Sequence, residues 1–152
     1  MTQRFLLIAL LVTAACSGLD TLTPELLKEA EQKWKVIRPA SYRIVIDMSG
    51  DRVEAGRFEA TIRDGEVVSL RRNGSVISPG RGQDYSMDGL FQMLRQEMGL
   101  AEQPSMLGAP AGYSVYMQAL FDEATGRLIR YSRSVGGTSN AVEIDVVEYG
   151  EN

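Results

Sequence analysis

The sequence predicts an α+β fold, in which an N-terminal helix and a central helix pack on one face of an antiparallel sheet of five or six strands. Three observations support this prediction. Two segments, residues 24–38 and 87–98, repeat their apolar residues at helical spacing. The segments between and after them alternate apolar and polar residues, which is the pattern of strands with one face on a core. Glycine-containing turns separate the alternating segments, so neighbouring strands are expected to pair antiparallel.

The start of the chain has the pattern of an export signal. Arg4 precedes an unbroken apolar run at residues 5–12, and small residues follow the run. The run is too short to cross a bilayer, because a membrane-spanning helix needs about 20 apolar residues. We therefore predict that residues 1–15 are a signal peptide, cleaved between Ala15 and Cys16.

Cys16 is the only cysteine of the chain. The segment Ala14-Ala15-Cys16 resembles the lipobox of bacterial lipoproteins, although that pattern prefers Leu or Val where this chain has Thr13. The resemblance implies that a lipid is attached to Cys16 and tethers the mature protein to a membrane. By the Gram-negative sorting rule, Ser17 after the cysteine implies the outer membrane, on its periplasmic face. The alternative is an ordinary secretory signal, which would leave a soluble periplasmic or secreted protein with a free thiol.

Length and charge limit the organisation of the mature chain. We expect residues 16–22 to be a short tether and residues 23–149 to form a single domain, since that length suits one hydrophobic core. The formal net charge of the whole chain is −4 and there is no basic block, which argues against nucleic acid as a partner. With one cysteine, no disulfide can form within the chain, so packing must stabilise it.

The first helix is expected between Thr23 and Pro39. Thr23 can cap it, and Pro24 suits the first helical position because that residue needs no hydrogen-bond donor. Proline at residue 39 ends it. The apolar stripe comprises Leu26, Leu27, Ala30 and Trp34. On the polar side, favourable pairs four residues apart join Glu29 to Lys33 and Glu31 to Lys35.

From Ser41 onward the periodicity changes to two. The expected inward residues of three successive strands are Tyr42, Ile44, Ile46 and Met48, then Phe58, Ala60 and Ile62, then Val68 and Leu70. A two-residue loop at Asp64-Gly65 would set Phe58 opposite Arg71 and mix the faces. A three-residue loop, residues 63–65 with Gly65 left-handed, would pair Phe58 with Leu70. We therefore expect the three-residue loop.

A second helix is predicted to be capped by Ser86 and to end at Gly99. Its apolar stripe comprises Met87, Leu90, Phe91, Leu94 and Met98. Residues 100–112 then form a long connection, in which Met106 and Leu107 are the candidate partner-binding residues because no regular element buries them. The alternative is that this connection folds back on the domain. Three further strands complete the sheet, at residues 113–121, 127–134 and 141–149.

Several short motifs lie at the starts of these predicted elements. They are Trp34, Ser41-Tyr42-Arg43, Asp64-Gly65, Tyr85-Ser86-Met87-Asp88-Gly89-Leu90-Phe91, Phe121-Asp122 and Gly126-Arg127-Leu128-Ile129. Together they resemble an uncharacterised family of bacterial secreted and lipid-anchored proteins, a domain of unknown function, over residues 31–149. The chain lacks the Cys-x-Cys that many members carry after the first strand. The resemblance implies a compartment and a fold, and no activity.

The side chains that usually carry catalysis are mostly missing. The chain has no histidine, which excludes Ser-His-Asp catalysis and the commonest zinc ligand. We expect no cofactor and no metal. Glu143 and Asp145 could form an acid pair of the glycosidase type. They alternate with apolar residues, so we expect them to face solvent and to pair with Arg127, Arg130 and Arg133 on the preceding strand.

These observations predict a non-catalytic binding or interaction module of the bacterial envelope. Its expected partners are the membrane, through the N-terminal lipid, and an envelope protein or small-molecule ligand. The alternative is an inhibitor or accessory subunit that docks on a periplasmic enzyme through a loop. A concave pocket between helix and sheet would favour a small ligand, whereas a protruding patch at Met106 and Leu107 would favour a protein partner.

Overall fold

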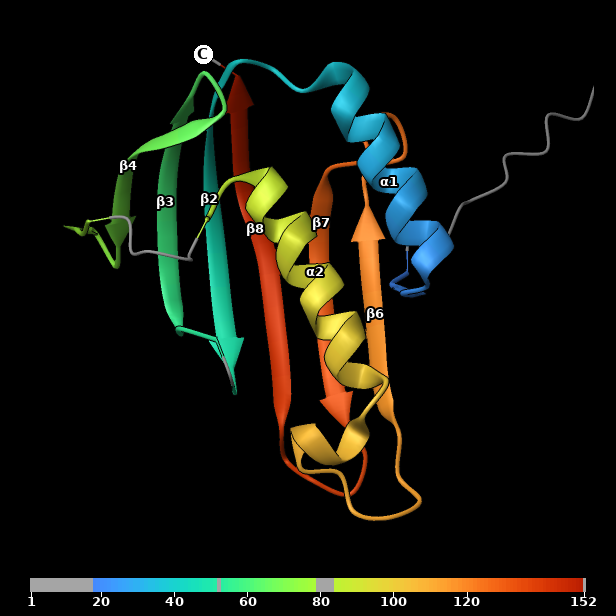
Figure 1. The fold of residues 1–152 in the computed structure, drawn as a ribbon. Helices are drawn as coiled ribbons and strands as arrows, with labels where there is room; N and C mark the ends of the chain where they lie inside the picture. Colours follow the sequence, from blue (N-terminus) through green and yellow to red (C-terminus); the bar gives the residue numbers. More distant parts are fainter. Residues whose placement is uncertain (1–17, 52, 79–83, 152) are drawn as a thin grey trace, which may run out of the picture.

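The computed structural model describes residues 18–51, 53–78 and 84–151. The predicted signal peptide, its cleavage site and Cys16 lie outside the described residues. The described chain forms one antiparallel sheet with the strand order β1-β6-β7-β8-β2-β3-β4-β5 (Figure 1). Its strands are β1 (Asp20–Thr21), β2 (Ser41–Gly50), β3 (Gly56–Arg63), β4 (Glu66–Arg72), β5 (Ser75–Val76), β6 (Val115–Phe121), β7 (Leu128–Val135) and β8 (Ala141–Glu151). The helices are α1 (Pro24–Ile37), α2 (Met87–Ala101) and the short 3-10 helix η1 (Pro104–Leu107).

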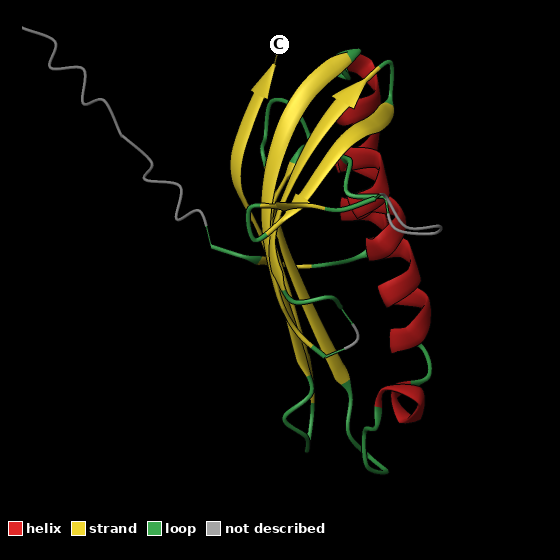
Figure 2. Ribbon diagram, turned by 90° about the vertical axis from the view of Figure 1, so that its left-hand side faces the viewer, coloured by secondary structure: helices red, strands yellow, loops and turns green. Residues whose placement is uncertain are grey.

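The predicted architecture, a sheet of five or six strands with helices packed on one face, is wrong. Eight strands form the sheet, which contains more of the described residues than the two α-helices do. The edge strands β1 and β5 are two residues long, so they carry no alternating pattern. β1 also pairs with β6, far along the chain, and such a pairing leaves no local signal. Figure 2 shows the curved sheet from its side, with the helices to its right.

The start of the sheet lies within the segment that was expected to be a tether. Asp20 and Thr21 pair with β6, and the amide of Leu22 donates to the carbonyl of Met117 at 2.9 Å. The side chain of Leu22 is buried in the core. Residues 20–22 therefore belong to the folded domain and not to a tether.

Local capping positions both helices as the sequence predicts. The amide of Leu26 donates to Oγ1 of Thr23 at 3.2 Å, and the amide of Gly89 donates to Oγ of Ser86 at 3.1 Å. These bonds satisfy amides that have no partner inside the helix. The predicted pairs on α1 are also confirmed, with Lys33 2.9 Å from Glu29 and Lys35 3.1 Å from Glu31. α2 continues two residues beyond the predicted end at Gly99.

The predicted three-residue loop between β3 and β4 is wrong. Only Asp64 and Gly65 connect the strands, with φ of 51° and 80°, which is the left-handed backbone of a tight two-residue hairpin. A bulge between Thr61 and Ile62 shifts the register, so that Ala60 lies opposite Leu70. The bulge supplies the extra residue that keeps Leu70 on the core face, so no longer loop is needed. The prediction that Val68 also points inward is wrong, because the shifted register places Val67 opposite Ile62 and leaves Val68 53% exposed.

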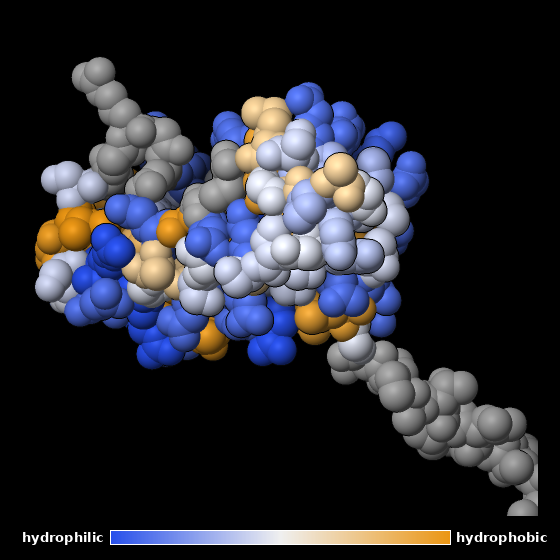
Figure 3. Space-filling model, turned by 90° about the horizontal axis from the view of Figure 1, so that it is seen from below, coloured by the Kyte–Doolittle hydropathy of each residue, from blue (hydrophilic) through white to orange (hydrophobic). Residues whose placement is uncertain are grey.

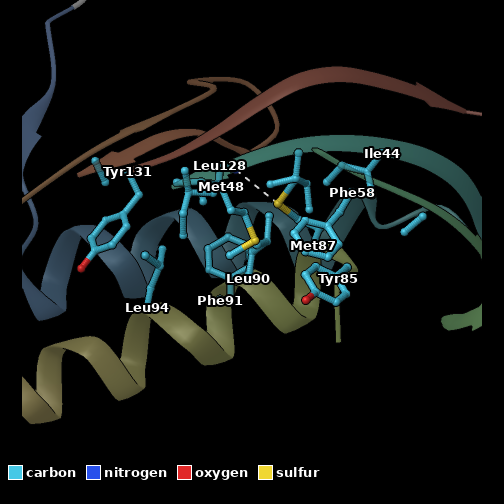
Figure 4. Packing of buried hydrophobic residues seen from close by; sticks show 14 of the residues in the cluster. Ile44, Met48, Phe58, Tyr85, Met87, Leu90, Phe91, Leu94, Leu128 and Tyr131 are labelled. Atoms are coloured by element: carbon cyan, nitrogen blue, oxygen red, sulfur yellow. Dashed lines mark hydrogen bonds between the residues drawn. The ribbon is translucent and has the colours of Figure 1, made fainter. Parts of the chain in front are cut away.

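The described residues form one hydrophobic core between the helices and the sheet (Figure 4). Leu90, Phe91 and Leu94 of α2 pack in this core with Tyr131 of β7. The hydroxyl of Tyr42 on β2 accepts a hydrogen bond from the buried amide of Met87 at 2.9 Å, which fixes the start of α2 on the sheet. Across the described chain, no helix has the length and apolar character to span a membrane.

Candidate binding groove

A groove lies between α2, the end of β2 and the turn between β2 and β3. We call it the α2 groove, and its volume is about 290 Å³. This volume is at the lower end of the range for small-molecule sites, roughly 300–1,000 Å³. It is lined by Met48, Val53, Glu54, Asp84, Tyr85, Gly89, Leu90, Gln92, Met93, Gln96, Glu97 and Leu100.

One wall of the α2 groove is a single flank of the helix. The helical residues that line it recur every three or four positions: Gly89, Gln92, Met93, Gln96, Glu97 and Leu100. A Cβ atom at residue 89 would lie 1.9 Å from the carbonyl oxygen of Asp84. Glycine at this position therefore allows the segment before α2 to lie against the first turn of the helix. That close approach forms the end of the groove near Asp84 and Tyr85.

The carboxylates of the α2 groove differ in their partners. Glu97 pairs with Arg133, and Glu54 lies 3.5 Å from Nη1 of Arg72. Asp84 accepts a hydrogen bond from the amide of Ser86 at 2.8 Å and makes no ion pair with any described residue. None of the described residues that line the groove is a lysine or an arginine. The groove therefore presents negative charge to a ligand.

The base of this site is a buried ion pair that the sequence did not predict. The side chains of Arg133 and Glu97 are 0% and 7% exposed, and Nη1 of Arg133 donates to Oε2 of Glu97. Nη2 of Arg133 donates to Oδ1 of Asn140 at 2.7 Å, and the hydroxyl of Tyr131 donates to Oε2 of Glu97 at 3.4 Å. Among the described residues, Nε of Arg133 has no hydrogen-bond partner. The pair joins α2 to β7 and to the loop before β8.

The expectation that Arg133 faces solvent is therefore wrong. Tyr131, Arg133 and Val135 are all buried, and they share one face of β7 because alternate residues of a strand point the same way. Burial raises the pKa of the Tyr131 hydroxyl, so this group remains a hydrogen-bond donor. The sequence held one sign of this burial: Arg133 follows Tyr131 by two positions, so the two side chains share one face of the strand.

The outer face of the sheet carries one of the cross-strand pairs that the sequence predicts, whereas Arg127 lies 3.8 Å from Asp122 instead of pairing with β8. Arg130 of β7 donates to Asp145 of β8, and both side chains are partly exposed. Two further bonds on this face were not predicted: Arg43 donates to Glu59 at 3.0 Å and to Glu148 at 2.8 Å. Within the described residues, no group of three or more acidic, histidine or cysteine side chains is placed to hold a metal ion.

The structure separates the two candidate partner-binding residues. Leu107, at the end of η1, is 2% exposed, and its carbonyl accepts a hydrogen bond from Nδ2 of Asn140 at 3.0 Å. Met106, one residue earlier, is 57% exposed. Leu107 therefore packs on the domain, while Met106 lies at its surface.

Comparisons with known proteins do not assign this chain to a family. The resemblance to uncharacterised bacterial envelope proteins therefore remains a prediction. No protein-family model matches the sequence, and no curated protein matches it.

Proposed function

We propose that this protein is a non-catalytic binding module of the bacterial envelope and that the α2 groove holds a small ligand. In this proposal, a lipid on Cys16 anchors the domain at the periplasmic face of the outer membrane. The observation that supports the ligand is a concave groove between a helix and the sheet, lined by apolar side chains and a few polar groups. Ligand sites in proteins commonly have this composition.

The polar groups of the groove suit binding better than catalysis. The described lining contains no serine, threonine, cysteine or lysine that could act as a nucleophile, and the chain has no histidine to serve as a base. Burial and the neighbouring Glu54 raise the pKa of the Tyr85 hydroxyl to about 12, so the phenol keeps its proton. That hydroxyl donates to Oε2 of Glu54 at 3.3 Å, which holds the carboxylate in place.

A second candidate function is docking on a periplasmic enzyme, and one surface favours it. Residues 103–117 and 134–142 contain no charged residue. They meet where the amide of Gly136 donates to the carbonyl of Ser114 at 2.9 Å. Met106 and Tyr113 are more than half exposed at this uncharged end, which Figure 3 views from below as a pale area bordered by hydrophilic residues. A protein partner could cover such a surface.

Native mass spectrometry of the protein purified from envelopes tests the proposed function. We expect the wild-type protein to carry a bound small molecule and Gln96→Trp, which fills the groove, to lose it. Gln32→Trp is the matched control, because residue 32 is exposed on α1 away from the groove. Loss of a protein partner in Met106→Asp, with no small molecule bound to any variant, would favour the docking function instead.

A further inference from the structure

We infer that the α2 groove binds a small amphiphilic cation, with an elongated apolar part and one protonated amine. This inference rests on the proposed function and adds the chemical class of the ligand. The shape of the groove, its apolar wall and its distribution of charge each contribute to it.

The groove is elongated because one side of it follows α2. Gly89 and Leu100 line it and are three helical turns apart, which corresponds to roughly 16 Å at about 1.5 Å per residue. The volume of about 290 Å³ is spread over that length. An elongated ligand fits this shape better than a compact one.

The middle of the groove is apolar. Met48 of β2 and Val53 of the following turn line it together with Leu90, Met93 and Leu100 of α2. Two of these five residues are methionines, whose flexible thioether side chains adapt to apolar ligands of different shape. This wall would bury the apolar part of the ligand.

The charged end of the groove lies near the start of α2. Asp84 immediately precedes Tyr85, and the Tyr85 hydroxyl bonds to Glu54, so both carboxylates lie at this end. The ring of Tyr85 stacks on Phe58 with centroids 4.2 Å apart, which fixes its position. An amine at this end could therefore bond to a carboxylate on either side of Tyr85.

The balance of charge favours a cation over an anion or a neutral molecule. Arg133 compensates Glu97 from inside the protein, and Arg72 lies beside Glu54, whereas Asp84 makes no ion pair with any described residue. A neutral apolar ligand would give the exposed Asp84 carboxylate no opposite charge. An anionic ligand would be repelled. A protonated amine would give Asp84 an opposite charge and a charge-assisted hydrogen bond.

Three probes of nearly equal shape test this inference: 4-phenylbutan-1-amine, 4-phenylbutan-1-ol and 4-phenylbutanoate. The purified protein is labelled with carbon-13 at its methionine methyl groups and titrated with each probe by NMR. We expect the amine to shift the methyl signals of Met48 and Met93 and to leave those of Met106 and Met117 unchanged. We expect it to bind roughly ten-fold more tightly than the alcohol, and the carboxylate to bind most weakly.

Two variants separate the role of charge from folding. Asp84→Asn keeps the oxygen that accepts from the Ser86 amide and removes the negative charge, so we expect it to abolish the preference for the amine. Asp64→Asn makes the same change at the β3–β4 hairpin and should leave the preference intact. Equal binding of the three probes, or tightest binding of the carboxylate, would overturn the cation inference and leave the groove as a ligand site. If no probe shifted Met48 or Met93, both the inference and the proposed function would fall.

Discussion

Arginine and carboxylate side chains are arranged in opposite ways on the two faces of the sheet. On the outer face, pairs such as Arg130 with Asp145 are exposed, and water and salt screen them, so they contribute little to stability. On the helix side, Arg133 and Glu97 form one pair that is almost completely buried. The outer pairs therefore keep a strand face soluble, whereas the inner pair holds three segments in position beside the groove.

The largest expected effect comes from breaking the inner pair. Glu97→Ala leaves the Arg133 guanidinium buried without its counter-charge, and we expect the free energy of unfolding to fall by about 3–5 kcal/mol. Urea unfolding followed by circular dichroism measures the loss. The double variant Glu97→Leu with Arg133→Met removes both charges and should recover most of it. If Glu97→Ala were no less stable than the wild-type protein, the inner pair would be as weak as the outer ones.

Two glycines of α2 provide the next test. Gly89→Ala would place a Cβ atom 1.9 Å from the Asp84 carbonyl oxygen, so we expect a loss of about 1–3 kcal/mol from overpacking and a distorted groove. Gly99→Ala has no neighbour within 4 Å and should gain about 1 kcal/mol from helix propensity. Urea unfolding of both variants checks these signs. If both variants were stabilised equally, the Asp84 carbonyl would not lie as close to residue 89 as the structure shows.

Breaking an outer pair should have a much smaller effect. Arg43 bonds to Glu59 and Glu148 with all three side chains partly exposed. Arg43→Met should therefore change the melting temperature far less than Glu97→Ala does, and added salt should reduce the difference further. Calorimetry at low and high salt measures both changes. A loss as large as that of Glu97→Ala would remove the distinction between the two faces.

The smallest effect concerns the pH dependence of the outer face. Hydrogen bonds from Arg57 lower the pKa of Asp47 below its ordinary value of 3.8. Because the folded-state pKa is depressed, the stabilisation is fully present above the ordinary value and is lost as the pH falls through the lowered one. In Arg57→Met, the Asp47 pKa should return toward 3.8. A carboxyl NMR titration that gave the same pKa in both proteins would contradict the contact.

The sequence predicts the features of this fold that depend on neighbouring residues. The caps at Thr23 and Ser86 are confirmed, because a cap is set by the residues within one helical turn. The strand count was wrong because the edge strands β1 and β5 are only two residues long and β1 pairs with β6, which lies far along the chain. The β3–β4 register was wrong because a bulge changes which residues face each other while leaving the alternation of each strand almost intact.

The candidate site was harder to predict than the fold. Glu97 follows Leu94 by three residues and so lies on the apolar stripe of α2, and this position was the available sign of a buried carboxylate. Its partner Arg133 belongs to a strand 36 residues later in the chain. The groove itself combines the flank of α2 with Met48 and with residues before the helix. No local pattern connects these segments, because tertiary packing brings them together.

The most direct test of the ligand site is a crystal structure of the protein purified from the envelope without exchange of its bound molecules. We predict electron density for a small elongated molecule between Met48 and Met93, with a nitrogen atom within about 3 Å of a carboxylate oxygen of Asp84, which is the distance of a charge-assisted hydrogen bond. A groove filled by side chains of this same chain, with Asp84 paired to one of its arginines, would contradict the account.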